Sequence, residues 1–105
     1  QKGREISKPG MSMHDLDDGV TKVLEASDYK DFIVHKTGHG LGMDVHEDPY
    51  VMRKNYELLE KGMIITIEPG LYKDKHLGIR VEDDVLITNE GCKSLTSFDR
   101  DLRVI

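Results

Sequence analysis

Hydrophobic side chains recur at helical spacing near the start of the chain. The stripe consists of Leu16, Val20, Val23, Leu24 and Ser27. Because helical residues repeat about every 3.6 positions, these side chains would share one face of a helix. Ser12 precedes the stripe as a candidate N-cap, and Asp15 follows it as in a capping box. The pattern predicts a helix over residues 13–27, after the end of an earlier element at residues 1–7.

Alternating hydrophobic positions mark two strands farther along the chain. The apolar positions are Ile65 and Ile67 in the first, and Ile79, Val81, Val85 and Ile87 in the second. The first strand lies within residues 62–72 and ends at Pro69. The second lies within residues 77–88 and continues past an irregularity at residues 83–84.

A glycine-rich stretch, residues 33–42, lies between the helix and these strands. Because each glycine would destabilise a helix interior by about 1 kcal/mol, we expect a short strand that leads into a glycine-rich loop. Residues 48–50 indicate a break, and residues 55–61 a short helical turn. The order of elements predicts one α+β domain over residues 1–105, with an antiparallel sheet and a packed helix.

Composition and net charge argue against several classes of binding partner. The net charge is -5, which disfavours binding to nucleic acid or to an anionic membrane surface. No apolar run is long enough to span a membrane. Cys92 is the only cysteine, so no internal disulfide can form. A chain of this kind is typical of a reducing compartment, and we expect a cytoplasmic location.

His39 is the first candidate for chemistry, since Gly38 and Gly40 flank it. Glycines on both sides would leave room for a large partner to approach the ring, and neutral imidazole is a common ligand of divalent metals. The alternative is a loop histidine that is hydrogen-bonded to the backbone.

Glu68 and Glu82 are the second candidates, because each stands on a mostly apolar strand. A buried carboxylate is costly unless it is paired or bound to a cation. With His39 they would form a set suited to Mn²⁺, Co²⁺, Fe²⁺ or Zn²⁺. Arg80 lies two residues before Glu82 and would point to the same face, where it could hold the carboxylate. The alternatives are a solvated sheet face and an ordinary ion pair.

The remaining histidines and acids are weaker candidates. His35 and His46 flank His39 and could donate hydrogen bonds to a substrate, or they could be surface residues. We expect Asp83 and Asp84 to be turn or edge residues. His14 and His76 are expected on the surface, and nothing near Cys92 marks its thiol as activated.

Three runs of residues resemble the pita-bread (M24-type) metallopeptidases, which include Xaa-Pro aminopeptidases, prolidases and methionine aminopeptidases. The runs are TGHGLGMDVHEDPY, LEKGMIITIEPGLY and GIRVEDDVLIT, with KPGMS upstream of the helix. They cover nearly the whole chain in the family's order. The wording around VHEDP and EPGLY is most similar to the proline-specific branch. The resemblance implies the C-terminal half of the pita-bread fold and hydrolysis of X-Pro bonds by a hydroxide that bridges two divalent ions.

The resemblance also implies a role for each matching residue. His39, Glu68 and Glu82 match three of the family's five metal ligands, and Glu68 also matches the general acid or base. His46 matches a histidine that stabilises the tetrahedral intermediate, and His35 one that positions the substrate. Arg80 matches an arginine behind the metals, and Tyr72 a tyrosine beside the site. The ions would be Mn²⁺ or Co²⁺ in the first instance, with Zn²⁺ or Fe²⁺ as alternatives.

The family's two remaining ligands are aspartates in an upstream half that this chain does not contain. The resemblance therefore implies partial or no metal occupancy, and an inactive chain when it is alone. The expected partners are a peptide substrate and either the missing half of the fold or a second chain. A half-fold that exposes its inner sheet should also form a homodimer or be poorly soluble. Methionine aminopeptidase activity and a non-catalytic peptide- or protein-binding module are the alternative functions.

Overall fold

The computed structural model describes all residues from Gln1 to Ile105. Its helices are α1 (Lys2–Ile6), α2 (Met13–Glu25) and the short 3-10 helix η1 (Lys30–Phe32). Its strands are β1 (Gly38–Gly40), β2 (Glu47–Val51), β3 (Ile64–Ile67), β4 (Gly70–Lys73), β5 (Leu77–Arg80), β6 (Asp83–Ile87) and β7 (Cys92–Ser94).

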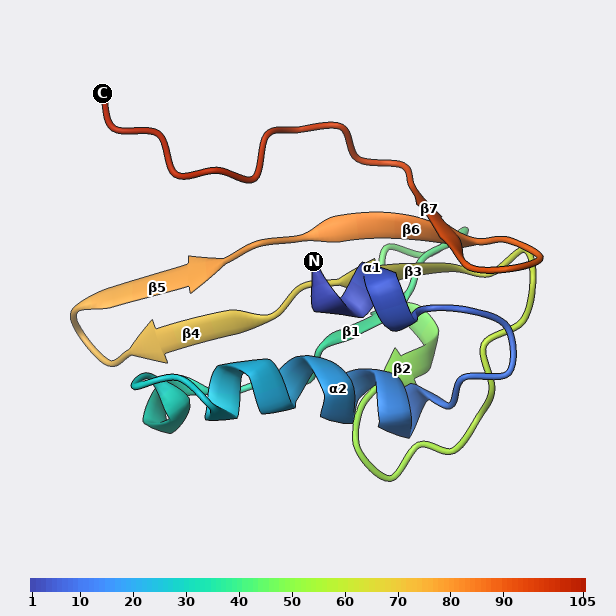
Figure 1. Cartoon of the computed structure of the whole chain (residues 1–105), viewed down its shortest axis with the longest axis horizontal. Helices are drawn as coiled ribbons and strands as arrows, with labels where there is room; N and C mark the ends of the chain where they lie inside the picture. The colour runs from blue at the N-terminus through green and yellow to red at the C-terminus, as the bar shows by residue number, and fades with distance from the viewer.

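The strands form a five-stranded sheet in the order β2-β1-β3-β6-β7 and a separate β4-β5 hairpin. Every pairing is antiparallel. Figure 1 shows the hairpin extending away from the sheet, with α2 running alongside both. The predicted α+β class, with an antiparallel sheet and a packed helix, is confirmed.

Helix α2 begins where its cap was predicted. The Ser12 side chain accepts a hydrogen bond from the Asp15 amide at 3.0 Å, which satisfies one of the free N–H groups at the helix start. The helix ends at Glu25, two residues earlier than predicted. Val23 was predicted on the packed face, but 54% of its surface is exposed.

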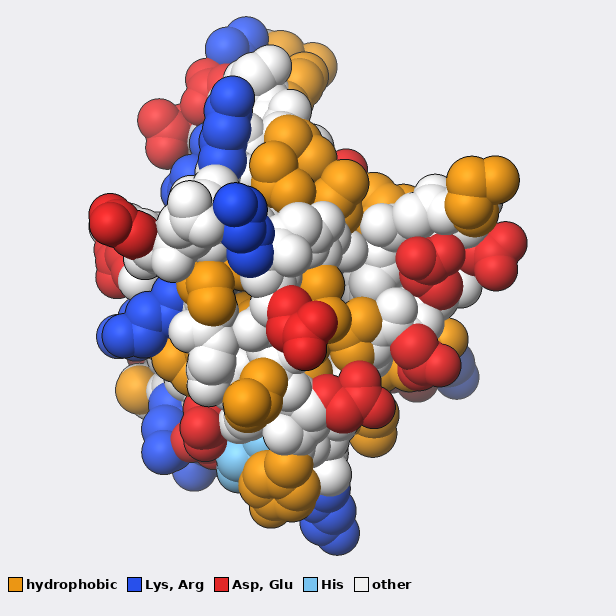
Figure 2. Space-filling view, turned by 90° about the vertical axis from the view of Figure 1, so that its right-hand side faces the viewer, with side chains coloured by type: hydrophobic (Ala, Val, Ile, Leu, Met, Phe, Trp, Pro, Cys, Tyr) orange, Lys and Arg blue, Asp and Glu red, His pale blue; other side chains and the backbone are white.

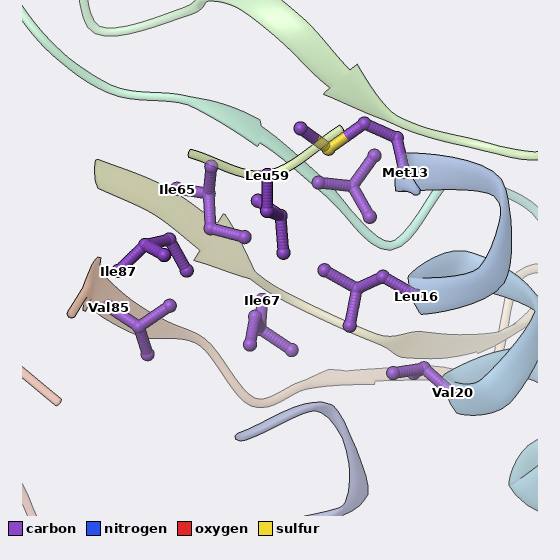
Figure 3. Packing of buried hydrophobic residues seen from close by; sticks show 9 residues of the cluster. Met13, Leu16, Val20, Leu59, Ile65, Ile67, Val85 and Ile87 are labelled. Carbon is purple, nitrogen blue, oxygen red and sulfur yellow. The ribbon is translucent and has the colours of Figure 1, made fainter. Parts of the chain in front are cut away.

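The core lies between α2 and one face of the sheet. Nine hydrophobic residues are buried together: Met13, Leu16, Val20, Val51, Leu59, Ile65, Ile67, Val85 and Ile87. Figure 3 shows Leu16 and Val20 of α2 pointing toward Ile67 of β3. The predicted alternation in residues 62–72 is confirmed, because Ile65 and Ile67 both face this core.

The two long strands predicted in the second half are each divided. Pro69 has no N–H to donate, so sheet pairing by β3 ends before it and β4 begins after it. The irregularity in the other strand falls at residues 81–82, not at the predicted residues 83–84. Ile79 and Val81, the apolar positions of the predicted alternation, are 56% and 45% exposed.

The glycine-rich stretch is where the prediction differed most from the structure. The strand does not precede the glycines but consists of Gly38, His39 and Gly40, all buried. A Cβ on Gly38 would lie 1.9 Å from the Thr66 carbonyl oxygen, and one on Gly40 would lie 2.4 Å from the Asp48 carbonyl oxygen. These glycines therefore serve close contact with neighbouring backbone, and the predicted open access to His39 is wrong.

Two connector predictions were also wrong. Residues 48–50 belong to β2, where Asp48-Pro49 is a cis peptide bond. Residues 55–61 form no helical turn, and Leu58 instead bridges to Ser12. No helix has the length and apolar character needed to cross a membrane. Figure 2 shows one end of the molecule, where acidic and basic side chains are mixed with hydrophobic ones.

Candidate functional site

The candidate site lies where the sheet continues into the β4-β5 hairpin. In the β3-β6 pair, Ile67 stands opposite Asp83, and in the hairpin Gly70 stands opposite Arg80. The same register places Glu68 opposite Glu82 in the short links between these strands. The Val81 amide donates to the Pro69 carbonyl at 3.3 Å, which holds the two links together. The sequence placed each glutamate on an apolar strand, but both lie in the links between strands, on two segments that run antiparallel side by side.

Arg80 connects the two carboxylates. Its Nε lies 3.4 Å from Glu68 Oε2, and its terminal nitrogen lies 3.3 Å from Glu82 Oε2. Arg80 and Glu82 were predicted to point to the same face, and their ion pair shows that they do. Like charges directly opposite each other in a sheet are destabilising. A positive charge between Glu68 and Glu82 offsets that repulsion, and the Arg80 guanidinium supplies it here.

His39 is fixed from both sides of its ring. Its Nδ1 lies 2.8 Å from the Gly40 carbonyl oxygen. A carbonyl can only accept, so Nδ1 carries the proton and Nε2 of a neutral ring presents a lone pair. That Nε2 lies 3.0 Å from Glu68 Oε1, and only 5% of the His39 side chain is exposed. The β1-β2 register shifts between His39 and Gly40, an irregularity of the kind that redirects side chains near active sites.

The His39-Glu68 pair fits a cation. Two acceptor atoms that face each other require a shared proton or a positive ion between them. Ligands about 2.1 Å from one divalent ion, at the right angles of octahedral coordination, would lie about 3 Å apart. Glu82 is the third predicted ligand, but Arg80 stands between it and this pair. No three His, Cys, Asp or Glu side chains of the chain gather closely enough to hold a metal ion.

The other predicted residues lie around this pair in two groups. The exposed His46 packs on the ring of His39, with 4.4 Å between the ring centroids. His35 and Tyr72 form the second group, with centroids 5.4 Å apart. His35 Nδ1 lies 2.7 Å from the Lys36 carbonyl oxygen, so it donates there, and Nε2 lies over Gly70. His35 and His46 thus carry ring nitrogens at the surface, His46 beside the buried His39 and His35 beside the hairpin.

A buried aspartate behind the site was missed by the sequence reasoning. Asp17 lies on α2 and is 6% exposed. Its Oδ1 accepts from the Thr37 amide at 3.0 Å and from the Thr37 hydroxyl, and its Oδ2 accepts from the Arg53 amide at 3.0 Å. The Thr37 carbonyl in turn accepts from the Glu68 amide at 2.7 Å. The signal available was a polar residue within the apolar stripe of the helix, next to Leu16.

Asp83 was predicted as a turn or edge residue, and that prediction was wrong. Asp83 and Asp84 both lie in β6, and Asp83 is 6% exposed. Its carboxylate accepts from Arg100 Nε at 2.7 and 2.8 Å and from the Thr96 hydroxyl at 2.9 Å. Burial alone would raise the pKa of Asp83, but the hydrogen bonds from Arg100 and Thr96 outweigh it and hold that pKa below its usual value.

The remaining minor candidates have ordinary environments. His14 Nδ1 accepts from the Lys54 amide at 2.9 Å, and the ring stacks on Tyr56. His76 is exposed and contacts the Asp74 carbonyl oxygen. Burial raises the pKa of the Cys92 thiol, so nothing activates it as a nucleophile.

Comparison with known proteins matches most of the chain to one protein family. The model of metallopeptidase family M24 matches residues 1–89. The Xaa-Pro dipeptidase of Pyrococcus furiosus is 43% identical over 98 residues, which is 93% of this chain and 28% of that protein. The Xaa-Pro dipeptidase of Lactobacillus helveticus is 37% identical over 105 residues, which is all of this chain and 28% of that protein. The chain therefore spans about 28% of the length of these curated relatives.

Solved structures agree with the sequence relatives. The prolidase from Pyrococcus horikoshii OT3 superposes with a TM-score of 0.92 at 41% identity, over 97% of this chain and 29% of that one. The Xaa-Pro dipeptidase from Bacillus anthracis gives a TM-score of 0.94 at 32% identity, over 99% of this chain and 29% of that one. The fold is that of the pita-bread peptidases, as the resemblance implied, and a metallopeptidase implies divalent ions. The chain belongs to metallopeptidase family M24.

Proposed function

We propose that the intact gene product hydrolyses short peptides at X-Pro bonds, and that this chain contributes His39, Glu68 and Glu82 to a site for divalent ions. One observation carries the proposal. Two carboxylates stand opposite each other in the links between paired strands, and a buried imidazole directs its lone pair at one of them. An arrangement so rich in acceptors calls for a cation. Family membership and the names of the relatives supply the reaction class and the X-Pro bond.

Each residue has a separate task in the proposed reaction. His39 and Glu68 would hold an ion together, and Glu82 would join them once Arg80 withdraws from between the carboxylates. Bound ions would acidify a water molecule and polarise the peptide carbonyl. Glu68 would accept the proton of the attacking water and return it to the leaving amine. His46, on the ring of His39, would donate a hydrogen bond to the developing oxyanion.

His35 and Tyr72 would position the substrate. Both rings lie beside Gly70 of the hairpin. A side chain in place of Gly70 would displace the His35 ring. Arg80 would keep the two carboxylates aligned until an ion takes its place between them. The ions would be Mn²⁺ or Co²⁺, and the other ligands would come from the remainder of the protein or from a second chain.

Metal content and peptide hydrolysis test the proposal together. The intact gene product should bind Mn²⁺ or Co²⁺, cleave an X-Pro dipeptide, and lose activity to a strong chelator. Glu68→Gln should lower kcat by about 10²- to 10⁴-fold, since that is what general acid–base catalysis contributes. Glu60→Gln, on an exposed side chain, is the matched control and should behave as wild type. A wild-type protein that neither binds metal nor cleaves such peptides would refute the proposal.

A peptide-binding module without catalysis is the second candidate function. It is favoured by the finding that no three ligating side chains gather in this chain. Peptide binding that is unchanged by a chelator, in a protein that cleaves nothing, would support this candidate over the first.

A further inference from the structure

Thr66 is a buried hydroxyl that contacts both members of the His39-Glu68 pair. It lies in β3 and is 1% exposed. Its Oγ1 accepts from the His39 amide at 3.1 Å. The same Oγ1 lies 3.2 Å from Glu68 Oε1, the oxygen that faces the His39 ring. No feature of the sequence had singled out this residue.

The hydrogen bonds of Thr66 have a defined direction. A hydroxyl has one proton and can accept through its lone pairs. Because the His39 amide can only donate, Thr66 accepts from it. An ionised Glu68 can only accept, so the hydroxyl proton points to Glu68 Oε1. The backbone of His39 thereby orients the carboxylate that its own side chain faces.

The two oxygens of Glu68 consequently have different partners. Oε1 faces Thr66 and the His39 ring, whereas Oε2 faces Arg80 Nε at 3.4 Å. This division holds the carboxylate in one rotation about its terminal bond, with Oε1 beside His39 Nε2. Partners that orient a ligand in this way affect metal affinity or activity by about 10- to 100-fold.

We propose that Thr66 is a positioning residue that sets Glu68 Oε1 against His39 Nε2, and so preorganises these two residues for a divalent ion. The inference rests on the proposed function. It assigns the hydroxyl a task beyond satisfying a buried amide, which any acceptor could do. A purely structural role predicts that loss of the hydroxyl changes stability alone.

Three variants separate these roles in the intact gene product. Thr66→Val has nearly the same shape but no hydroxyl, and valine is well accommodated in a strand. Thr66→Ser keeps the hydroxyl and loses the methyl group. Thr66→Ala loses both, and it replaces Thr66→Val if that variant does not fold. Mn²⁺ affinity by titration calorimetry, kcat and KM for an X-Pro dipeptide, and the melting temperature are measured for each.

The expected result is a loss specific to the hydroxyl. Thr66→Val and Thr66→Ala should bind Mn²⁺ about 10- to 100-fold more weakly, while Thr66→Ser stays within about threefold of wild type. At saturating Mn²⁺ the valine variant should lose kcat more than KM. Equal Mn²⁺ affinity in the valine, serine and wild-type proteins would overturn the proposal. A serine variant as impaired as the valine variant would also overturn it, because packing of the methyl group would then be the cause.

A second measurement stays informative if the proposed function fails. In metal-free protein labelled with ¹⁵N, the chemical shift of His39 Nε2 reports the partner of that nitrogen. Thr66→Val should shift this signal and Thr66→Ser should not. An unchanged His39 signal in Thr66→Val refutes the positioning role even in a protein without metal or peptidase activity. If the signal changes in a protein that shows neither metal binding nor peptidase activity, the positioning role stands, and the missing activity rejects only the proposed reaction.

Discussion

Replacing Asp17 by asparagine should remove one of the hydrogen bonds that this side chain accepts behind the candidate site. The carboxylate accepts from two backbone amides on different segments: the buried Thr37 N–H on Oδ1 and the partly buried Arg53 N–H on Oδ2, both at 3.0 Å. Asparagine keeps one acceptor oxygen and turns the other position into a donor. Retaining the oxygen on the Thr37 side keeps three hydrogen bonds, from the Thr37 amide and from the Thr37 and Thr21 hydroxyls, and loses one, so the Arg53 amide should be the one that loses its partner.

The size of the effect follows from that count. A buried donor left without a partner costs about 1 to 3 kcal/mol. Asp17→Asn should therefore destabilise the region by about 1 to 3 kcal/mol, and Asp17→Ala, which frees both amides, by about 2 to 6 kcal/mol. Native stability is only about 5 to 15 kcal/mol in total, so the alanine variant approaches the limit of folding.

Amide hydrogen exchange in the intact gene product measures each donor separately. Asp17→Asn should speed exchange of the Arg53 amide by roughly 5- to 150-fold while the Thr37 amide stays protected. Asp17→Ala should expose both. Asp18→Asn is the matched control, because the Asp18 carboxylate contacts the side chains of Lys22 and Arg53 at the surface and no backbone amide. The reasoning is refuted if Asp17→Asn and Asp18→Asn protect the Arg53 amide equally.

Three further outcomes test other contacts. Gly38→Ala should prevent or severely weaken folding, because its Cβ would lie 1.9 Å from the Thr66 carbonyl oxygen, and a wild-type melting temperature would contradict this. The lowered pKa of Asp83 means that its stabilising contribution is complete above the unfolded pKa of about 3.9 and is lost as pH falls through the folded value. As the pH is lowered from about 5 to about 3, the free energy of unfolding measured in urea should therefore fall more in wild type than in Asp83→Asn. It should also fall less in Arg100→Ala than in wild type. An equal fall in all three proteins would contradict this prediction. Leu16→Ala, at a fully buried position, should cost about 2 to 5 kcal/mol by urea unfolding, and a loss under about 1 kcal/mol would show that the core collapses around the gap.

Helix α2 could be predicted because its signals are local. The Ser12 cap and the stripe at Leu16 and Val20 lie within a few residues of the contacts they make. Strand β1 could not, since glycine has low strand preference and Gly38 is needed for contact with the distant Thr66. The need for glycine at this position is apparent only when β1 and β3 are paired in the folded sheet.

In the candidate site, too, local spacing could be predicted and contacts between distant segments could not. Alternation placed Arg80 and Glu82 on one face, and the structure bears this out. The position of Glu68 opposite Glu82 depends on the register of two strands, which periodicity does not encode. Asp83 resembled a turn residue because the partner that defines it, Arg100, comes from the far end of the chain.

The placement of the histidines has a consequence for engineering specificity. His39 lies in β1, flanked on both sides by hydrogen-bonded strands, so substitutions around it disturb the sheet itself. His35 and His46 stand outside the strands on exposed segments, where changes of sequence and length are tolerated more readily. A directed-evolution library aimed at new peptide sequences should therefore vary the exposed residues 34, 36 and 43–45, keep His35 and His46, and leave 37–40 untouched. Such a library would retain most of its folded members while sampling the surface around the two histidines that are proposed to contact the substrate.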